Sequence, residues 1–241
     1  MLKDEDQDTR EKALELTKGL AKFLDGLLGE DLLGFYLLGS LAHGGFNRRY
    51  SDIDIGLILK TSQSTFHLEE LRKHAAYQAP DLANKVSIFW TDQTFSVGRF
   101  PPLDRLDYLD NSVALLEREV IRPDRPSLDD IRNYLQGSPF ENWVNNTKRF
   151  VSIKSLGQED HKPFLRSFLY AARFFFSWRT GILASNDAAM ALMREEKPIG
   201  FDLPLLETAF QIRLSAADPD PLFKQRKSLT TLVDACSRLR E

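Results

Sequence analysis

Residues 32–59 read LLGFYLLGSLAHGGFNRRYSDIDIGLIL, and this stretch decides the fold class of the chain. Two apolar segments, 32–38 and 53–59, flank a Gly39-Ser40 turn and a loop rich in glycine and arginine. Apolar runs of this length bounded by turn residues are typical of buried β-strands. The stretch therefore predicts two neighbouring strands joined by a Gly-Ser turn and a polar loop.

Two aspartates at the start of the second strand indicate chemistry. Side chains alternate between the faces of a strand, so Asp52 and Asp54 are expected to share one face. Ile53, Ile55 and Leu57 are expected to point the other way, into a core. Two carboxylates on one face repel each other unless a cation joins them, and Mg²⁺ prefers such oxygens together with phosphate oxygens. The turn before them exposes backbone N–H groups and the Ser40 hydroxyl to a phosphate. This combination predicts a site for nucleotide-phosphate chemistry.

The same residues resemble the signature of the DNA polymerase β-like nucleotidyltransferase superfamily, which is Gly-Ser, a spacer, and Asp-x-Asp followed by apolar residues. Gly39, Ser40, Asp52 and Asp54 match it. The resemblance implies that Asp52 and Asp54 are catalytic and hold Mg²⁺ or Mn²⁺, and that Gly39 and Ser40 bind the phosphates of ATP or another nucleoside triphosphate. Arg49 is a further candidate for phosphate binding, and a solvated loop charge is the alternative reading of that residue.

The remaining pattern predicts two domains. A run of arginine, proline and aspartate at 122–126 indicates a linker, so we expect a nucleotidyltransferase-like domain at 1–124 and a helical domain at 125–241. In the first domain we predict a small mixed sheet with helices on one side. Its remaining elements are helices at 9–28, 65–78 and 102–116 and strands at 85–90 and 119–122. In the second domain we predict helices at 140–156, 163–179, 185–196, 203–215 and 221–240.

A second resemblance lies in the helical half. Residues 173–189 read RFFFSWRTGILASNDAA and resemble the helix–turn–helix core of bacterial aminoglycoside adenylyltransferases. There too an aromatic-rich helix ends at Thr-Gly, although Thr180-Gly181 is also an ordinary helix C-cap. The resemblance implies an α+β fold in which a small mixed-sheet nucleotidyltransferase domain is followed by an all-α helical bundle that binds the acceptor.

One position departs from the superfamily pattern. The resemblance implies a third carboxylate on the strand after Asp-x-Asp, but residues 84–90 read NKVSIFW and contain none; Lys85 stands at the acidic position. Three alternatives follow. Asp92 at the end of that strand replaces the acid, Asp104 or Asp107 reaches in from the next helix, or the site binds nucleotide and catalyses poorly or not at all.

Composition limits the class of protein. The 241 residues carry a formal net charge of -3, which gives no argument for nucleic-acid binding. The single cysteine, Cys236, excludes an internal disulfide and a cysteine–histidine zinc cluster and indicates a reducing compartment. The acidic N-terminus lacks an apolar signal region, and no apolar run is long enough to span a membrane. We therefore expect a cytoplasmic protein without a membrane partner.

Together these observations predict a nucleotidyltransferase that transfers a nucleoside monophosphate, AMP from ATP, to a hydroxyl of a small molecule such as an aminoglycoside-like antibiotic. Lys85 favours an alternative, which is an inactive or weakly active relative that acts as a nucleotide sensor or binding partner. A protein-modifying antitoxin-type transferase is a further alternative, but the long helical half argues against it.

Overall fold

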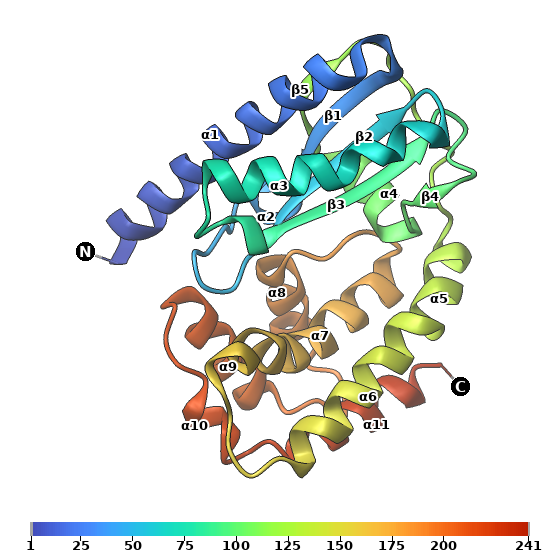
Figure 1. The fold of residues 1–241 in the computed structure, drawn as a ribbon. Coiled ribbons are helices and arrows are strands. Elements are labelled where there is room, and N and C mark those ends of the chain that lie inside the picture. The colour runs from blue at the N-terminus through green and yellow to red at the C-terminus, as the bar shows by residue number, and fades with distance from the viewer. Residues whose placement is uncertain (1, 241) are drawn as a thin grey trace. The chain divides into compact units, whose positions relative to one another are not determined.

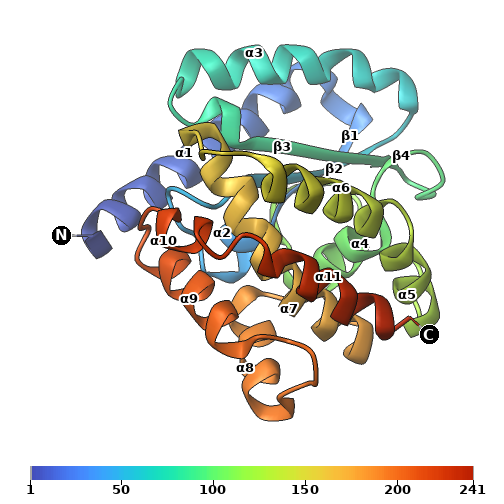
Figure 2. The ribbon, with the colours of Figure 1, turned by 90° about the horizontal axis from the view of Figure 1, so that it is seen from below.

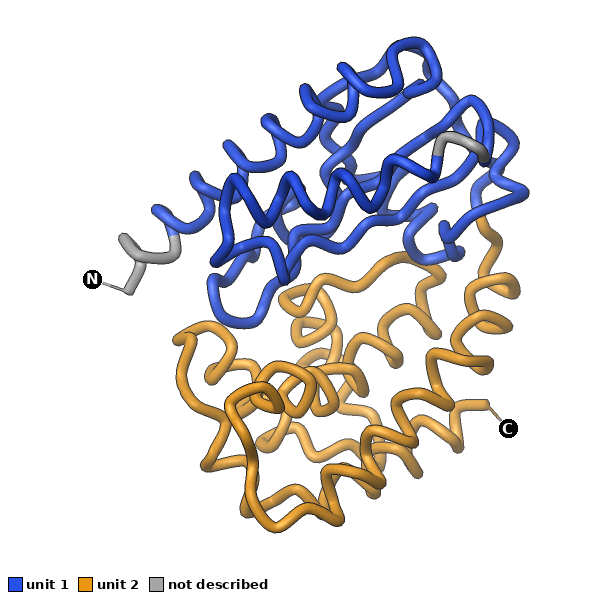
Figure 3. The backbone as a smooth tube through the Cα atoms, viewed as in Figure 1, with its two compact units in different colours: residues 1–125 blue, residues 126–241 orange. Residues whose placement is uncertain are grey.

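The computed structural model describes the backbone of residues 2–240 and the side chains of these residues except 2–6, 63 and 64. The chain divides into two compact units, residues 1–125 and residues 126–241 (Figure 3). Each unit is described by itself.

Unit 1 is built around a five-stranded mixed sheet (Figure 1). Its order is β4-β3-β2-β1-β5, with β2 and β3 parallel and all other neighbours antiparallel. The strands predicted at 32–38 and 53–59 are confirmed with those bounds, and the third is shifted slightly toward the C-terminus. The strands are β1 Leu32–Leu38, β2 Ile53–Leu59, β3 Val86–Asp92, β4 Gly98–Arg99 and β5 Val113–Glu117.

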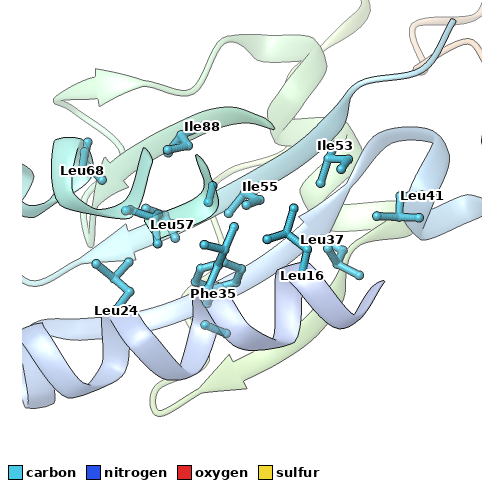
Figure 4. Close-up of a cluster of buried hydrophobic side chains, with 14 of the residues drawn as sticks. Leu16, Leu24, Phe35, Leu37, Leu41, Ile53, Ile55, Leu57, Leu68 and Ile88 are labelled. Atoms are coloured by element: carbon cyan, nitrogen blue, oxygen red, sulfur yellow. The ribbon is translucent and has the colours of Figure 1, made fainter. Parts of the chain in front are cut away.

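Two long helices cover one face of this sheet. They are α1 (Leu2–Leu28) and α3 (Leu68–Gln78), and α3 follows a 3₁₀ helix at Ser62–His67. Their apolar stripes pack on alternate residues of the strands, including Phe35, Ile55 and Leu57, to form one core (Figure 4). Burying a leucine or phenylalanine side chain contributes about 2 kcal/mol, so this layer is a main source of stability for unit 1.

The other face of the sheet carries a second core, so the expected one-sided arrangement of helices is wrong. Tyr36, Ile58 and Phe89 pack there against Tyr108 of helix α4 (Pro102–Asn111). Figure 2 shows α3 and α4 on opposite sides of the layer formed by β2 and β3. The reason is visible in β1, where all seven residues are buried, which requires cover on both faces.

The chain between α4 and the second unit also differs from the prediction. The expected helix through Leu116 ends at Asn111, and residues 113–117 form β5 along the edge of β1. The predicted strand at 119–122 is not present in this part of the described chain. The local sequence allows helix or strand at 113–117, and the unpaired edge of β1 selects the strand because it supplies hydrogen-bond partners.

Unit 2 is all helical, as predicted. Helix α7 contacts α5, α6, α8, α9 and α11, and most of its side chains are buried, which confirms the prediction of a central bundle helix. Helix α5 was not predicted, although Ser127 and Asp130 form a capping box at its start. The helices are α5 Leu128–Gln136, α6 Ser138–Ser152, α7 His161–Thr180, α8 Asn186–Glu196, α9 Leu203–Leu214, α10 Asp220–Phe223 and α11 Ser228–Arg238.

Gly181 ends α7 in the left-handed conformation with a φ of 71°. Ser185 and Asp202 cap the following helices α8 and α9 through their side chains. Over residues 2–240, no helix has the length and apolar character required to cross a membrane.

Candidate nucleotide-phosphate site

The Gly39-Ser40 turn forms the start of a short helix, α2 (Gly39–His43), and meets Asp54 at one end of the sheet. The antiparallel register pairs Leu38, the last residue of β1, with Asp54 of β2. Gly39 follows with a φ of 63°, and a Cβ atom built on it would overlap the carboxylate of Asp54. The close approach and the positive φ both require glycine at this position. The sequence prediction that Asp54 lies beside the turn is therefore met by the geometry.

Asp52 immediately precedes β2, two residues before Asp54. Both side chains are half-buried, while Ile53 between them is fully buried in the core formed with α1 and α3. This burial pattern agrees with an alternation of faces, and a shared face for Asp52 and Asp54 stays a prediction. A pair of half-buried carboxylates is accessible to a ligand while remaining tied to a rigid strand.

The loop between the turn and β2 is closed by hydrogen bonds that the sequence analysis missed. The Ser40 hydroxyl donates to Oγ of Ser51 at 3.0 Å, and the backbone N–H of Asn47 donates to the same oxygen at 3.0 Å. The Asn47 side-chain oxygen accepts from the backbone N–H groups of Arg49 and Tyr50, each at 3.0 Å. An asparagine that accepts from backbone two and three residues ahead is a local turn signal, so Asn47 was recognisable in the sequence.

Arg49 is half-buried on this loop, and its guanidinium carbon lies 5.5 Å from the ring centroid of buried Tyr50. Arg48 is also half-buried, and His43 is exposed. The hydrogen bonds of Asn47 fix the backbone of Arg49, and the aromatic ring limits where its guanidinium points. Phosphate binding by Arg49 stays a prediction.

Asp107 of α4 is a further functional candidate at the turn. Its Oδ2 accepts from the backbone N–H of Gly39 at 2.6 Å, and its Oδ1 accepts from the Asn111 amide at 3.1 Å. Asp107 is only 5% exposed. Of the two helix aspartates considered from the sequence, Asp107 makes this contact, while Asp104 lies three residues earlier on the same helix.

The parallel register of β2 and β3 locates the residues proposed for the missing acid. Ile53 pairs with Val86 and Asp54 with Ser87, so Lys85, the last residue of a 3₁₀ helix at Ala83–Lys85, immediately precedes the first pair on its strand, as Asp52 does on β2. Asp92 pairs with Leu59, five residues beyond Asp54, or about 16 Å along the strand. Thr94 and Ser96 also hydrogen-bond the Asp92 carboxylate in a local turn. Asp92 therefore cannot replace the acid beside Asp52 and Asp54.

The donor set fits one divalent cation. Mg²⁺ is held in many nucleotide enzymes by one or two carboxylates, with phosphate oxygens and water completing the octahedron. Asp52 and Asp54 provide two such carboxylates. The described residues contain no cluster of three or more histidine, cysteine or acidic side chains that would bind a metal by themselves. Metal binding by Asp52 and Asp54 thus stays a prediction that depends on nucleotide oxygens.

Comparison with known proteins relates this geometry to a solved structure. No protein-family model and no curated protein matches the sequence. Among solved structures, the chain is similar to the crystal structure of spectinomycin adenyltransferase AAD(9) from Enterococcus faecialis with ATP and spectinomycin, at 15% sequence identity and a TM-score of 0.63. The match covers 93% of this chain and 98% of that chain. The two chains share a fold. The fold predicted from the Gly-Ser and Asp-x-Asp pattern, a nucleotidyltransferase-type sheet unit followed by helices, is confirmed.

Proposed function

We propose that this chain is a nucleotidyltransferase that transfers AMP from ATP to a hydroxyl group of a small molecule in the cytoplasm. The observation that supports it best is the close approach of the Asp54 carboxylate to Gly39, because it places a carboxylate that could bind a metal ion beside a turn that could bind phosphate. The fold shared with an adenyltransferase that was solved with ATP and spectinomycin supports the same class of donor and acceptor. An aminoglycoside-like hydroxyl compound is therefore the first acceptor to test.

The reaction replaces the phosphoanhydride bond between the α- and β-phosphates of ATP with a phosphate ester bond to the acceptor. The acceptor oxygen attacks the α-phosphorus, the bond to the pyrophosphate oxygen breaks, and the hydroxyl proton passes to a base or to water. Asp52 and Asp54 would hold Mg²⁺, which supplies charge neutralisation on the phosphates when it is bound. Ser40, tied to Ser51, would position the phosphates, and Arg49 would add positive charge beside them.

A second candidate function is nucleotide binding without efficient turnover. The observation that favours it is the register of Lys85, which immediately precedes β3 as Asp52 precedes β2, where the superfamily pattern implies a carboxylate. An ammonium at this position opposes cation binding and cannot take up the proton of the attacking hydroxyl group.

The test combines a binding and a turnover measurement. ATP with Mg²⁺ should raise the thermal unfolding temperature, because a ligand that binds only the native state stabilises it. Asp52→Asn and Asp54→Asn should remove this increase, whereas Asp31→Asn, an exposed position beyond the other end of β1, should keep it. Pyrophosphate release is then measured with a panel of hydroxyl antibiotics. Pyrophosphate release that is lost in both site variants supports transfer. Thermal stabilisation without release supports the binding function. The absence of both stabilisation and release would contradict the proposal.

A further inference from the structure

The carboxylates of Asp107 and Asp54 both lie against Gly39 of the Gly39-Ser40 turn. Its carboxylate accepts the N–H of Gly39 at 2.6 Å, which is shorter than an ordinary N–H···O bond, as expected when the acceptor is charged. The Asp54 carboxylate occupies the space beside the Cα of the same glycine. Gly39 is therefore fixed at its nitrogen by one carboxylate and at its Cα by another.

Because Asp107 is buried, its carboxylate depends on the hydrogen bond from Gly39. A carboxylate that is 5% exposed loses most of its hydration and must recover it from hydrogen-bond donors. The N–H of Gly39 and the Asn111 amide are two such donors, so any movement of the turn away from α4 leaves the charge short of a partner. The turn is thereby coupled to the helix.

Helix α4 is a suitable platform because it is itself fixed. Tyr108, the neighbour of Asp107, is 1% exposed, packs at 4.8 Å from the ring of Tyr36, and donates its hydroxyl to the Ile121 carbonyl at 2.5 Å. Leu106 on the other side is fully buried. The carboxylate between them has little freedom to follow a moving turn.

We propose that Asp107 is a positioning residue: through the N–H of Gly39 it holds the Gly39-Ser40 turn in the conformation that binds the phosphates of the nucleotide. The inference rests on the proposed function, since it names the residue that orders the same site. It also assigns a role to Gly39. The glycine provides backbone conformation, and its N–H is bonded to Asp107, so phosphate contacts fall to Ser40 and the loop.

The test compares two substitutions that differ in whether an acceptor remains. Asp107→Ala removes the acceptor, and we expect the affinity for ATP with Mg²⁺ to fall about tenfold or more, as for loss of a bond to a charged group. Asp107→Asn keeps an oxygen that accepts from Gly39 and should stay within about threefold of the parent. In turnover, KM for ATP should rise in the alanine variant while KM for the hydroxyl acceptor stays unchanged.

Asp110→Ala is the matched control. It removes a carboxylate from the same helix, three residues on, where the side chain is exposed and pairs with Arg125 at 2.6 and 2.7 Å. This variant should bind ATP as the parent does. Hydrogen exchange of residues 38–41 adds a readout without nucleotide, and exchange should be faster in Asp107→Ala and unchanged in Asp107→Asn and Asp110→Ala.

The outcomes separate the two proposals. If the parent binds no ATP, the proposed function fails, and the exchange data still show whether Asp107 orders the turn. If the parent binds ATP and Asp107→Ala binds equally well with unchanged exchange, the positioning role is overturned. If Asp107→Asn loses affinity as severely as Asp107→Ala, the charge acts directly and positioning through Gly39 is again overturned. If the alanine variant does not fold, the asparagine variant decides alone: an affinity within about threefold of the parent supports positioning, and a loss of about tenfold or more overturns it.

Discussion

The carboxylate of Asp54 fills the space that a Cβ atom on Gly39 would need. This relationship joins the two halves of the sequence pattern, because Leu38 before the glycine pairs with Asp54 across β1 and β2. Only a residue without a Cβ atom fits at position 39, so substitution of Gly39 tests the geometry directly.

Gly39→Ala should destabilise the protein and abolish ATP binding. Alanine at a φ of 63° costs about 1 kcal/mol from backbone strain alone, and the overlap with Asp54 adds to it. Gly29→Ala is the control, since Gly29 has a φ of 53° with open space around it and should show only the strain. Urea unfolding and ATP titration measure both effects. Equal losses of stability in the two variants would argue against the close contact.

Lys85→Glu should strengthen binding of Mg²⁺ or Mn²⁺ in the presence of ATP by about tenfold, because it replaces a repelling charge, placed directly before β3 as Asp52 is before β2, by an oxygen ligand. Lys60→Glu makes the same change of charge directly after Leu59, at the opposite end of β2. Calorimetric titration with Mn²⁺ compares them. A similar gain in both variants would mean that net charge, and not the position of residue 85, controls cation binding. Turnover that appears only in Lys85→Glu would identify this position as that of the missing acid.

Asn47→Ala should unfold the loop that carries Arg49. Asn47 is 5% exposed and accepts from two backbone N–H groups, so its removal leaves buried donors unpaired and should cost about 2 kcal/mol. The expected result is a lower midpoint of urea unfolding together with weaker ATP binding. Asn146→Ala, at an exposed position of α6, should change neither quantity. Parent-like stability in Asn47→Ala would show that the loop is held by other contacts.

Stability should depend on Tyr36 at alkaline pH. Burial, with hydrogen bonding to Tyr108 and Glu117, raises the pKa of the Tyr36 hydroxyl above its ordinary value. The unfolded chain loses this proton near pH 10 while the folded protein keeps it, so the contribution is present below about pH 10 and is lost as the pH rises further. Tyr36→Phe should therefore make the alkaline fall in unfolding free energy shallower.

The measurement for Tyr36 is urea unfolding at several pH values between about 8 and 11. Phenylalanine also loses the hydrogen bond to Glu117, so the variant should be about 1 kcal/mol less stable at the lower end of this range. Tyr77→Phe, at a side chain that is 85% exposed, should follow the parent throughout. An alkaline slope that is the same in the parent and in Tyr36→Phe would contradict the assignment.

Much of the fold follows from local patterns. Segments 32–38 and 53–59 are apolar over a strand length and are bounded by turn residues, so their extent was predictable from the sequence. Caps and glycines mark the helices of unit 2 in the same way, and Ser127 with Asp130 shows that even the missed helix α5 carried a signal. These features depend on interactions within a few residues, which a linear pattern records.

The candidate site was predictable only in part. The spacing of Asp52 and Asp54 and their place after Gly39-Ser40 indicated the chemistry, because alternation along one strand needs no partner. Asn47 carried a local turn signal. Asp107 was named from the sequence only as one of two helix aspartates that could replace the missing acid. Its contact with Gly39 had no local signal, since an aspartate in the middle of an amphipathic helix is ordinarily a solvated residue.

What the sequence by itself determined is the pair of strands at 32–38 and 53–59, the helical character of unit 2 and the place of Asp52 and Asp54 after the Gly39-Ser40 turn. The tertiary structure alone decided which distant segments meet. It brought Asp107 to Gly39 across 68 positions of the chain, turned residues 113–117 into the edge strand β5, and set Lys85 directly before β3 in the register in which Asp52 precedes β2. The physical reason is that register and packing depend on backbone and apolar partners far along the chain, and their free energy exceeds the local preferences that a sequence pattern expresses.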